Sequence, residues 1–245
     1  MGYTPKEQLT KTAFAEGTVL LFDKPYGWTS FDVVGKIRGL IRHRLGLKKT
    51  KVGHAGTLDP LATGLLIVCT GKLTKSIDSY QALEKEYSGT FFIGQTTPSF
   101  DLETQPGELS PTEHITYDTV IQTTKKFIGS FEQIPPQFSA KKIEGERAYT
   151  YARQGQTRVL KPKNVSIRKF NITKFELPEI GFNVVCTKGT YIRALARDFG
   201  EALQTGAYLK DLRRERIGGF LVSDAWEVAN FESFIKNMQS SKGII

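Results

Sequence analysis

The segment GHAGTLDPLATG, from Gly53 to Gly64, holds the residues of this chain best suited to chemistry. It places His54 five residues before Asp59, between glycines and a proline. A residue before proline is restricted to extended backbone, so the Asp59 carboxylate must project from a loop rather than from a helix. The flanking glycines let a ligand or another part of the backbone come close. Because Asp-Pro is also a common turn, the segment alone leaves a structural and a catalytic interpretation open.

A carboxylate nucleophile needs a nearby cation that keeps it ionised and positioned in a pocket that excludes water. The segment KGTYIRALARD, residues 188–198, again places glycine, tyrosine and arginine at the end of an apolar run. Arg193 in this segment is a candidate for that cation, because a guanidinium group matches the geometry of a carboxylate.

The charged residues of the chain are segregated. The 245 residues carry a formal net charge of +9, and residues 33–58 contain seven lysines and arginines but no acidic residue. Residues 147–175 contain eight basic residues and again no acidic one, whereas 86–124 contain six acidic residues and no lysine or arginine. Such segregation favours a surface that binds a polyanion over an evenly solvated basic protein.

Composition excludes several classes of protein. Hydrophobic residues make up 39% of the chain, which argues against disorder, and no apolar run is long enough to span a bilayer. The first residues lack the apolar core of a secretory signal, so we expect a cytoplasmic protein. Cys69 and Cys186 each lie in an apolar run and are predicted to be buried free thiols. His43 and His114 lie in dissimilar contexts, so we expect no metal site.

Periodicity predicts alternating strands and helices of varied order. Strands are expected at 17–25, 64–71, 86–95, 166–177, 181–189 and 212–222, and helices at 28–46, 73–84, 116–131, 190–206 and 225–238. The basic segment 133–155 is expected to be irregular at first and then helical. Ser30 is the predicted N-cap of the second segment, and Gly206 is predicted to end the helix that begins near Thr190. The pattern indicates an α+β fold with a central mixed, largely antiparallel sheet flanked by helices, and without an interdomain linker.

Several motifs in order resemble the TruB family of tRNA pseudouridine synthases. Besides GHAGTLDPLATG, the matching motifs are DKPYGWTSFDVV at 23–34, KEYSGTFFIGQTTPSFD at 85–101, PPQFSAKK at 135–142, GTYIRALARDFGEAL at 189–203 and LRRERIG at 212–218. Together they cover most of residues 17–220. One motif alone would be a weak indication, whereas the ordered set is highly specific.

The resemblance implies the pseudouridine synthase fold and a reaction. Members of the family isomerise the uridine at position 55 in the T-loop of tRNA, and Asp59 matches their catalytic aspartate. Uracil is detached from its sugar, rotated and reattached through carbon. An ionised carboxylate could attack the sugar, attack the base or take a proton from the sugar, and the sequence leaves these routes open. The reaction requires no metal and no cofactor, so we expect none.

The target base must leave its stack, which costs a few kcal/mol. By resemblance, Tyr87 stacks on the flipped base, and stacking on an aromatic ring contributes about 1–3 kcal/mol per base. The alternative role for Tyr87 is core packing, because it shares a strand face with Phe91 and Ile93. His54 matches the histidine that fills the space the base vacates, with a hydrogen-bonded turn histidine as the alternative.

The resemblance assigns four further residues to substrate binding. Tyr191 and Arg193 match the pocket tyrosine and arginine, with an exposed helix start as the alternative. Leu212 matches a backbone contact to the base, with an ordinary buried leucine as the alternative. Lys24 is expected near the pocket or the phosphates, with a solvated turn lysine as the alternative.

The expected organisation is a polar N-terminal arm at 1–15 and a catalytic domain at 16–238. A basic insertion at about 135–165 is expected to clamp the T-arm of tRNA. Many relatives continue into a small C-terminal RNA-binding domain of the PUA type, but about 25 residues follow LRRERIGGF here, so we expect none. The predicted partner is tRNA, bound by a monomer with no membrane association.

Three rival functions stay open. An RNA-binding or tRNA-folding protein without essential catalysis would fit the charge distribution equally well. A glycosidase usually needs two carboxylates, and the Asp59 loop supplies one. A pseudouridine synthase that acts on a different RNA site is the third.

Overall fold

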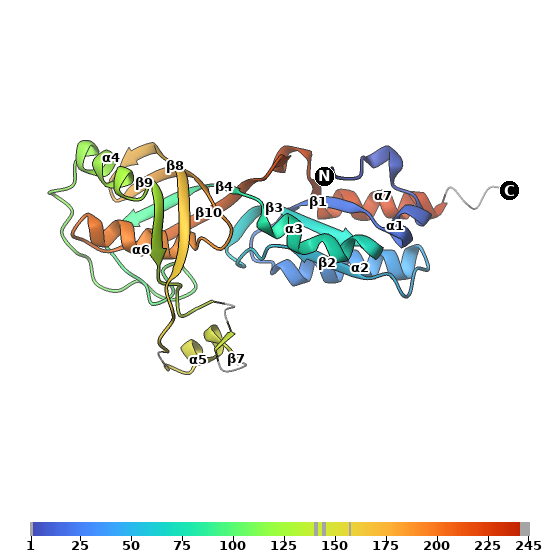
Figure 1. Cartoon of the computed structure of the whole chain (residues 1–245), viewed down its shortest axis with the longest axis horizontal. Coiled ribbons are helices and arrows are strands. Elements are labelled where there is room, and N and C mark those ends of the chain that lie inside the picture. The colour runs from blue at the N-terminus through green and yellow to red at the C-terminus, as the bar shows by residue number, and fades with distance from the viewer. Residues whose placement is uncertain (1, 140–141, 144–145, 157, 241–245) are drawn as a thin grey trace. The chain divides into compact units, whose positions relative to one another are not determined.

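The computed structural model describes residues 2–139, 142–143, 146–156 and 158–240 (Figure 1). The chain divides into two compact units: unit 1 comprises Met1–Lys85 and Arg213–Ile245, and unit 2 comprises Glu86–Leu212. Unit 2 is therefore inserted into the chain path of unit 1. Two strands, β4 (Lys85–Ile93) and β10 (Ala207–Ile217), contain the residues at which the chain passes between the units. The mixed sheet with flanking helices confirms the predicted α+β class.

Unit 1 is built on a mixed sheet. Its strands are β1 (Val19–Lys24), β2 (Val52–Ala55), β3 (Ala62–Thr70), the end of β10, β11 (Phe220–Leu221) and β12 (Trp226–Glu227). The order is β12-β1-β3-β10, with β2 also paired to β3 and β11 paired to β10. Strands β1 and β3 are antiparallel, with Leu21 opposite Ile67, as are the pairs β2–β3 and β10–β11, whereas β12 runs parallel to β1.

Helices cover both faces of the unit 1 sheet (Figure 1). They are α1 (Lys11–Glu16), α2 (Ser30–Arg44), α3 (Ile77–Ala82) and α7 (Val228–Ser240), with 3-10 turns η1 (Lys6–Gln8), η2 (Gly71–Ser76) and η3 (Val222–Asp224). Alternation along β1 sends Phe22 toward Ile37 of α2 and Phe231 of α7, and Leu21 toward Tyr80 of α3. The strands are buried on both faces, which explains their continuous apolar sequence.

The N-cap of α2 is Thr29, so the prediction of Ser30 was wrong by one residue. Thr29 Oγ1 accepts from the Asp32 backbone N–H at 3.0 Å, and Asp32 Oδ2 accepts from the Thr29 N–H at 2.8 Å. Two orphan N–H groups are thereby satisfied reciprocally. The Ser30 hydroxyl has another partner, because it accepts from the Leu58 N–H at 2.8 Å and donates to the Leu58 carbonyl oxygen at 3.2 Å.

The segment predicted to be a polar N-terminal arm packs on unit 1. It contains η1 and α1, and the Thr4 N–H donates to the carbonyl oxygen of Val19 at 2.8 Å. Leu9 and Phe14 are buried, and the Phe14 ring meets Phe231 edge-on at 6.2 Å. These few apolar side chains anchor an otherwise polar segment to the core.

Unit 2 has its own sheet segment, in the order β10-β4-β9-β8-β5. The strands not yet given are β5 (Gly129–Gln133), β8 (Lys163–Glu176) and β9 (Glu179–Cys186). Strands β8 and β9 form an antiparallel hairpin, as the sequence predicts, but its turn is shorter than expected because β9 already begins at Glu179. The core is aromatic: Phe91 stacks on Phe182 at 4.1 Å, and Phe199 packs on both Phe91 and Phe170.

Helices α4 (Tyr117–Lys126) and α6 (Ile192–Ala202) belong to unit 2. Helix α6 ends before the predicted Gly206, because Leu203 caps it and Gln204 takes a left-handed φ of 59°. The predicted helix over 116–131 also ends early, at Lys126, and Gly129 begins β5. The described part of the basic insertion contains β6 (Lys142–Ile143), β7 (Glu146–Arg147) and α5 (Ala148–Arg153).

Candidate active site

Asp59 lies, half-buried, in the loop that joins β2 to β3. Backbone contacts hold this loop on both sides of the aspartate. Leu58 is buried and bonded to the Ser30 hydroxyl, and the Pro60 carbonyl oxygen accepts from the Gly27 N–H at 2.9 Å. The Ala62 N–H donates to the Asp59 carbonyl oxygen at 3.1 Å. The carboxylate is therefore presented by a loop with a defined conformation.

Lys24, at the end of β1, contacts the backbone of this loop through its side chain. Its side chain is completely buried, and Nζ donates to the carbonyl oxygens of Trp28 at 2.6 Å, Pro25 at 3.0 Å and Pro60 at 3.4 Å. Burial lowers the pKa of Lys24 to about 8, against the opposing effect of the Asp59 charge. Because its side chain is buried, Lys24 is not the solvated turn lysine that the sequence left open as an alternative. Lys24 holds the turn at 25–28 against the Asp59 loop.

Arg214, which the sequence analysis did not single out, supports the other side of the loop. Its side chain is 1% exposed. Nη2 donates to the Gly56 carbonyl oxygen at 3.0 Å, Nη1 to Thr57 at 3.4 Å, and Nε to Leu65 in β3 at 2.7 Å. Gly64 also faces this arginine: its φ is +103°, and a Cβ there would lie 2.4 Å from the Arg214 carbonyl oxygen. A side chain at position 64 would therefore collide with the backbone that carries Arg214.

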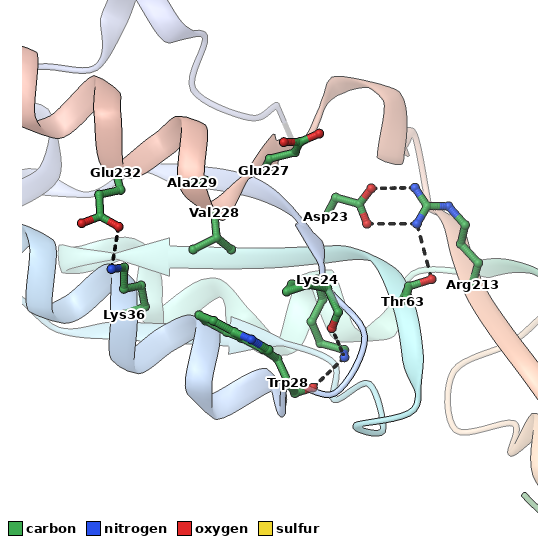
Figure 2. A pocket seen from close by; sticks show the side chains of 11 residues that line it. Asp23, Lys24, Trp28, Lys36, Thr63, Arg213, Glu227, Val228, Ala229 and Glu232 are labelled. Atoms are coloured by element: carbon green, nitrogen blue, oxygen red, sulfur yellow. Dashed lines mark hydrogen bonds and ion pairs between the residues drawn. The ribbon is translucent and has the colours of Figure 1, made fainter. Parts of the chain in front are cut away.

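The neighbouring Arg213 has a different environment, in a hollow of about 600 Å³ in unit 1 (Figure 2). Figure 2 shows its guanidinium group facing the Asp23 carboxylate. The Nη2–Oδ2 distance is 2.6 Å and the Nη1–Oδ1 distance is 3.0 Å. Nη1 also lies 3.4 Å from Thr63 Oγ1. This bidentate ion pair connects β1 to β10, and the guanidinium group of Arg213 therefore binds a carboxylate of the protein itself.

His54 lies in β2, opposite Val68. Burial and, to a lesser extent, the positive charge of Arg214 lower the pKa of His54 below its ordinary 6.5. This lowering favours the neutral imidazole at pH 7. The ring of Phe31 packs against it with a centroid separation of 5.2 Å and an interplanar angle of 84°. His54 is thus held as a neutral aromatic ring close in sequence to Asp59.

Unit 2 carries the other predicted residues. Tyr87 is 8% exposed and shares the buried face of β4 with Phe91 and Ile93, as the alternation predicts. Tyr191 is the N-cap residue of α6; its N–H donates to Gln133 Oε1 at 2.9 Å and its carbonyl oxygen accepts from Gln133 Nε2 at 3.1 Å. Leu212 lies half-buried in β10, at the end of the unit 2 segment.

Arg193 lies buried in the first turn of α6. The alternative that the sequence left open, an arginine exposed at the start of a helix, is therefore excluded. Its Nε lies 3.4 Å from Asp101 Oδ2. Nη1 donates to the Ser99 carbonyl oxygen at 3.2 Å, and Nη2 donates to that of Phe138 at 2.8 Å. Asp101 was missed by the sequence analysis, since nothing in its loop segment distinguishes it from the other acidic residues there.

The structure thus groups the predicted site residues by unit. Unit 1 carries Asp59, His54 and Lys24, and unit 2 carries Tyr87, Tyr191, Arg193 and Leu212. Within the described ranges, no group of three or more His, Cys, Asp and Glu side chains has an arrangement that could hold a metal ion. None of the helices in the part of the chain that the structure describes is both long and apolar enough to pass through a membrane.

Comparison with known proteins identifies the family. The model of the TruB family pseudouridylate synthase N-terminal domain matches residues 42–192. The tRNA pseudouridine synthase B of Flavobacterium johnsoniae is 50% identical over 229 residues, which cover 93% of this chain and 100% of that protein. The chain belongs to the TruB family. Another TruB relative, the tRNA pseudouridine synthase B of Phocaeicola vulgatus, is 54% identical over 92% of this chain and 96% of its own length.

Solved structures agree on the fold. A chain in the crystal structure of a Cbf5-Nop10-Gar1 complex matches 100% of this chain with a TM-score of 0.72 and 27% identity. The protein described here covers 61% of the length of the matched chain in that complex. A chain in the structure of an H/ACA RNP bound to a substrate RNA containing 2'-deoxyuridine matches with a TM-score of 0.69 and 24% identity, over 99% of this chain and 61% of its own length. The predicted pseudouridine synthase fold is confirmed.

Proposed function

We propose that this chain is a tRNA pseudouridine synthase that isomerises the uridine at position 55 in the T-loop of tRNA. The observation that carries this proposal is the Asp59 loop. Its carboxylate is half-buried, while buried Lys24 and Arg214 hold the backbone on either side. Relatives of at least 50% identity named tRNA pseudouridine synthase B support the same activity. Rigid placement of a reacting group removes much of the entropic cost of reaching the transition state.

In the proposed reaction, the bond between N1 of uracil and C1′ of ribose breaks, the base rotates, and C5 bonds to C1′. The proton that leaves C5 is matched by one gained at N1, so the reaction is an isomerisation without an oxidant. Asp59 is the catalytic residue, by attack on the sugar or the base or by removal of a sugar proton. The fixed loop serves each of these roles, because each requires the carboxylate at a defined position.

Extrusion of the target base exposes a gap in the RNA stack. The neutral ring of His54 is a suitable filler, since a planar uncharged ring can stack between bases without the desolvation cost of a charge. We assign Tyr87 to stacking on the flipped uracil, Tyr191 and Arg193 to its pocket, and Leu212 to a backbone contact with its edge. Lys24 is assigned to support of the loop rather than to direct contact with phosphate.

A basic hollow in unit 1 provides affinity for RNA phosphates. It has a volume of about 650 Å³ and lies between residues 46–51 and 71–75. Five exposed lysines line it, namely Lys48, Lys49, Lys51, Lys72 and Lys75. Lysines that neutralise phosphates release counterions, which makes binding strong at low salt and weak at high salt. We propose that the enzyme acts as a monomer, in the cytoplasm, on the T-arm of tRNA.

An unmodified T-arm stem-loop transcript tests this function. The transcript is incubated with wild-type protein, with Asp59→Asn, and with Asp78→Asn as a control for loss of an exposed carboxylate in unit 1. Pseudouridine is then mapped by carbodiimide labelling and primer-extension stops. We expect a stop at the T-loop uridine with wild type and Asp78→Asn, and none with Asp59→Asn. Binding by wild type without any stop would overturn the proposal in favour of an RNA-binding protein without catalysis.

A further inference from the structure

Two aromatic side chains close together in the sequence of unit 1 are more than half exposed. Tyr26 is 64% exposed and Phe31 is 60% exposed. Both belong to the segment that connects β1 to α2 and begins that helix. Burial of a phenylalanine side chain is worth about 1.5–3 kcal/mol relative to exposure, so a protein gains nothing in stability from displaying these rings.

The backbone beneath the two rings is firmly held. The Gly27 N–H, next to Tyr26, donates to the Pro60 carbonyl oxygen at 2.9 Å. Ser30, next to Phe31, makes two hydrogen bonds to Leu58. The capping box of Thr29 and Asp32 fixes the start of α2 between them. The exposed rings are therefore carried by the framework that also positions the Asp59 loop, not by a free loop.

Phe31 also contacts a residue of the proposed site. Its ring packs edge-to-face against His54, 5.2 Å away, yet more than half of its side chain stays exposed. His54 and Phe31 therefore form an adjoining pair of rings, and the exposed Tyr26 lies five residues before Phe31 on the turn that leads into α2. Unpaired RNA bases stack on such surfaces with little regard to sequence, because every base has a π-face.

We infer that Phe31 and Tyr26 form a stacking surface for unpaired bases of the RNA substrate that neighbour the target uridine. The inference rests on the proposed function, because His54 marks the site of the flipped base. A loop opened by base extrusion has lost stacking partners, and the aromatic surface replaces them. Phe31 contributes most, because it alone of the two is in ring contact with His54 among the contacts described.

The test is made in the Asp59→Asn background, in which we expect RNA to bind without turnover. T-arm stem-loops carry 2-aminopurine at each unpaired loop position in turn, since stacking on an aromatic ring quenches its fluorescence. We expect Phe31→Ala to relieve the quenching at a specific loop position and to weaken binding roughly 5- to 150-fold, as loss of one stacked base predicts. Phe31→Trp should retain both properties. Tyr3→Ala, at another exposed aromatic residue of unit 1, should change neither.

A role through His54 alone would give a different result. In a double-mutant cycle with His54→Ala, direct stacking leaves the Phe31→Ala effect on binding in place, whereas a role limited to holding His54 abolishes it and overturns the inference. Unchanged binding and quenching in Phe31→Ala would also overturn it, while pseudouridine formation by wild type would leave the proposed function intact. Conversely, absence of pseudouridine with a strong Phe31→Ala effect would reject the synthase and keep the stacking surface.

Discussion

The guanidinium group of Arg214 donates to the carbonyl oxygen of Gly56 at 3.0 Å and thereby holds the first residue after β2. The same group donates from Nε to Leu65 in β3, beyond the other end of the Asp59 loop. One buried side chain therefore spans the loop. Because the guanidinium group is planar and its donors are fixed in direction, the distance between the two ends of the loop is fixed with it.

Replacement of Arg214 by methionine should lower both stability and turnover. The carbonyl oxygens of buried Leu65 and half-buried Gly56 lose a charged donor, and each unsatisfied buried group costs about 1–3 kcal/mol, so we expect a loss of about 2–6 kcal/mol in urea denaturation. Turnover should fall with little change in the RNA dissociation constant. Arg213→Met is the matched control, because its partly exposed pair with Asp23 predicts a loss near 1 kcal/mol. Equal losses in the two variants would contradict this account.

The pKa of His54 should lie below 6.5, because burial and the charge of Arg214 both disfavour the imidazolium. The unfolded chain binds this proton more readily than the folded one. Stability from this group is therefore present above pH 6.5 and is lost as the pH falls through the folded pKa. An NMR titration of the His54 ring measures it directly. Arg214→Lys keeps the charge and should keep the low pKa, whereas Arg214→Met should raise it.

Lys24 should give a pH dependence at alkaline pH. Its pKa of about 8 in the folded protein lies below the ordinary 10.5, so the unfolded chain binds more protons between these values. Wild-type stability should therefore rise relative to that of Lys24→Met as the pH increases from 8 to 10.5, by up to roughly 3 kcal/mol. Urea denaturation of both proteins at several pH values measures the difference. A difference that stays constant or shrinks with pH would refute the assignment.

Asp101 should be necessary for the stability of unit 2. Arg193 and Asp101 form a pair in which both side chains are at least nine-tenths buried. Removal of one partner leaves a buried charge, so Asp101→Ala should cost about 3–5 kcal/mol. The double variant Asp101→Ala, Arg193→Met should be less damaged than Asp101→Ala alone, because it removes both charges. Thermal and urea unfolding measure the stability of both variants. A double variant that is less stable than Asp101→Ala alone would contradict the role of the ion pair.

The sequence predicted those elements whose apolar residues recur with a clear period. Strand β4 alternates and lies within two residues of its predicted bounds, and α6 carries a full apolar stripe and lies inside its predicted range, although it is shorter. Strand β5 was missed because its residues are mostly exposed and show no strong alternation. The capping residue of α2 was misplaced because Thr29 and Ser30 can both cap; Asp32, three residues after Thr29, was the distinguishing signal.

Within the candidate site, Asp59 and His54 were singled out because the segment from Gly53 to Gly64 is rich in glycine and polar groups, and their roles in the reaction stay predictions. Arg214 was not, since only the strand's register decides which of Arg213 and Arg214 turns inward. The burial of Lys24 was also unexpected, because lysine is almost never fully buried unless it is paired. Here three carbonyl oxygens, supplied by a turn and a distant loop, satisfy its amino group.

The discontinuous path of unit 1 has a consequence for synthesis on the ribosome. Phe14 and Phe22, near the N-terminus, both pack against Phe231 of α7. The 127 residues from 86 to 212 must be translated between the two parts of this core. At about 5–20 residues per second, this takes roughly 6–25 s, far longer than local folding events need. During that interval the nascent N-terminal third has α2 but not α7 on this face of its sheet, so we expect chaperones to bind the apolar surface that Phe231 later covers.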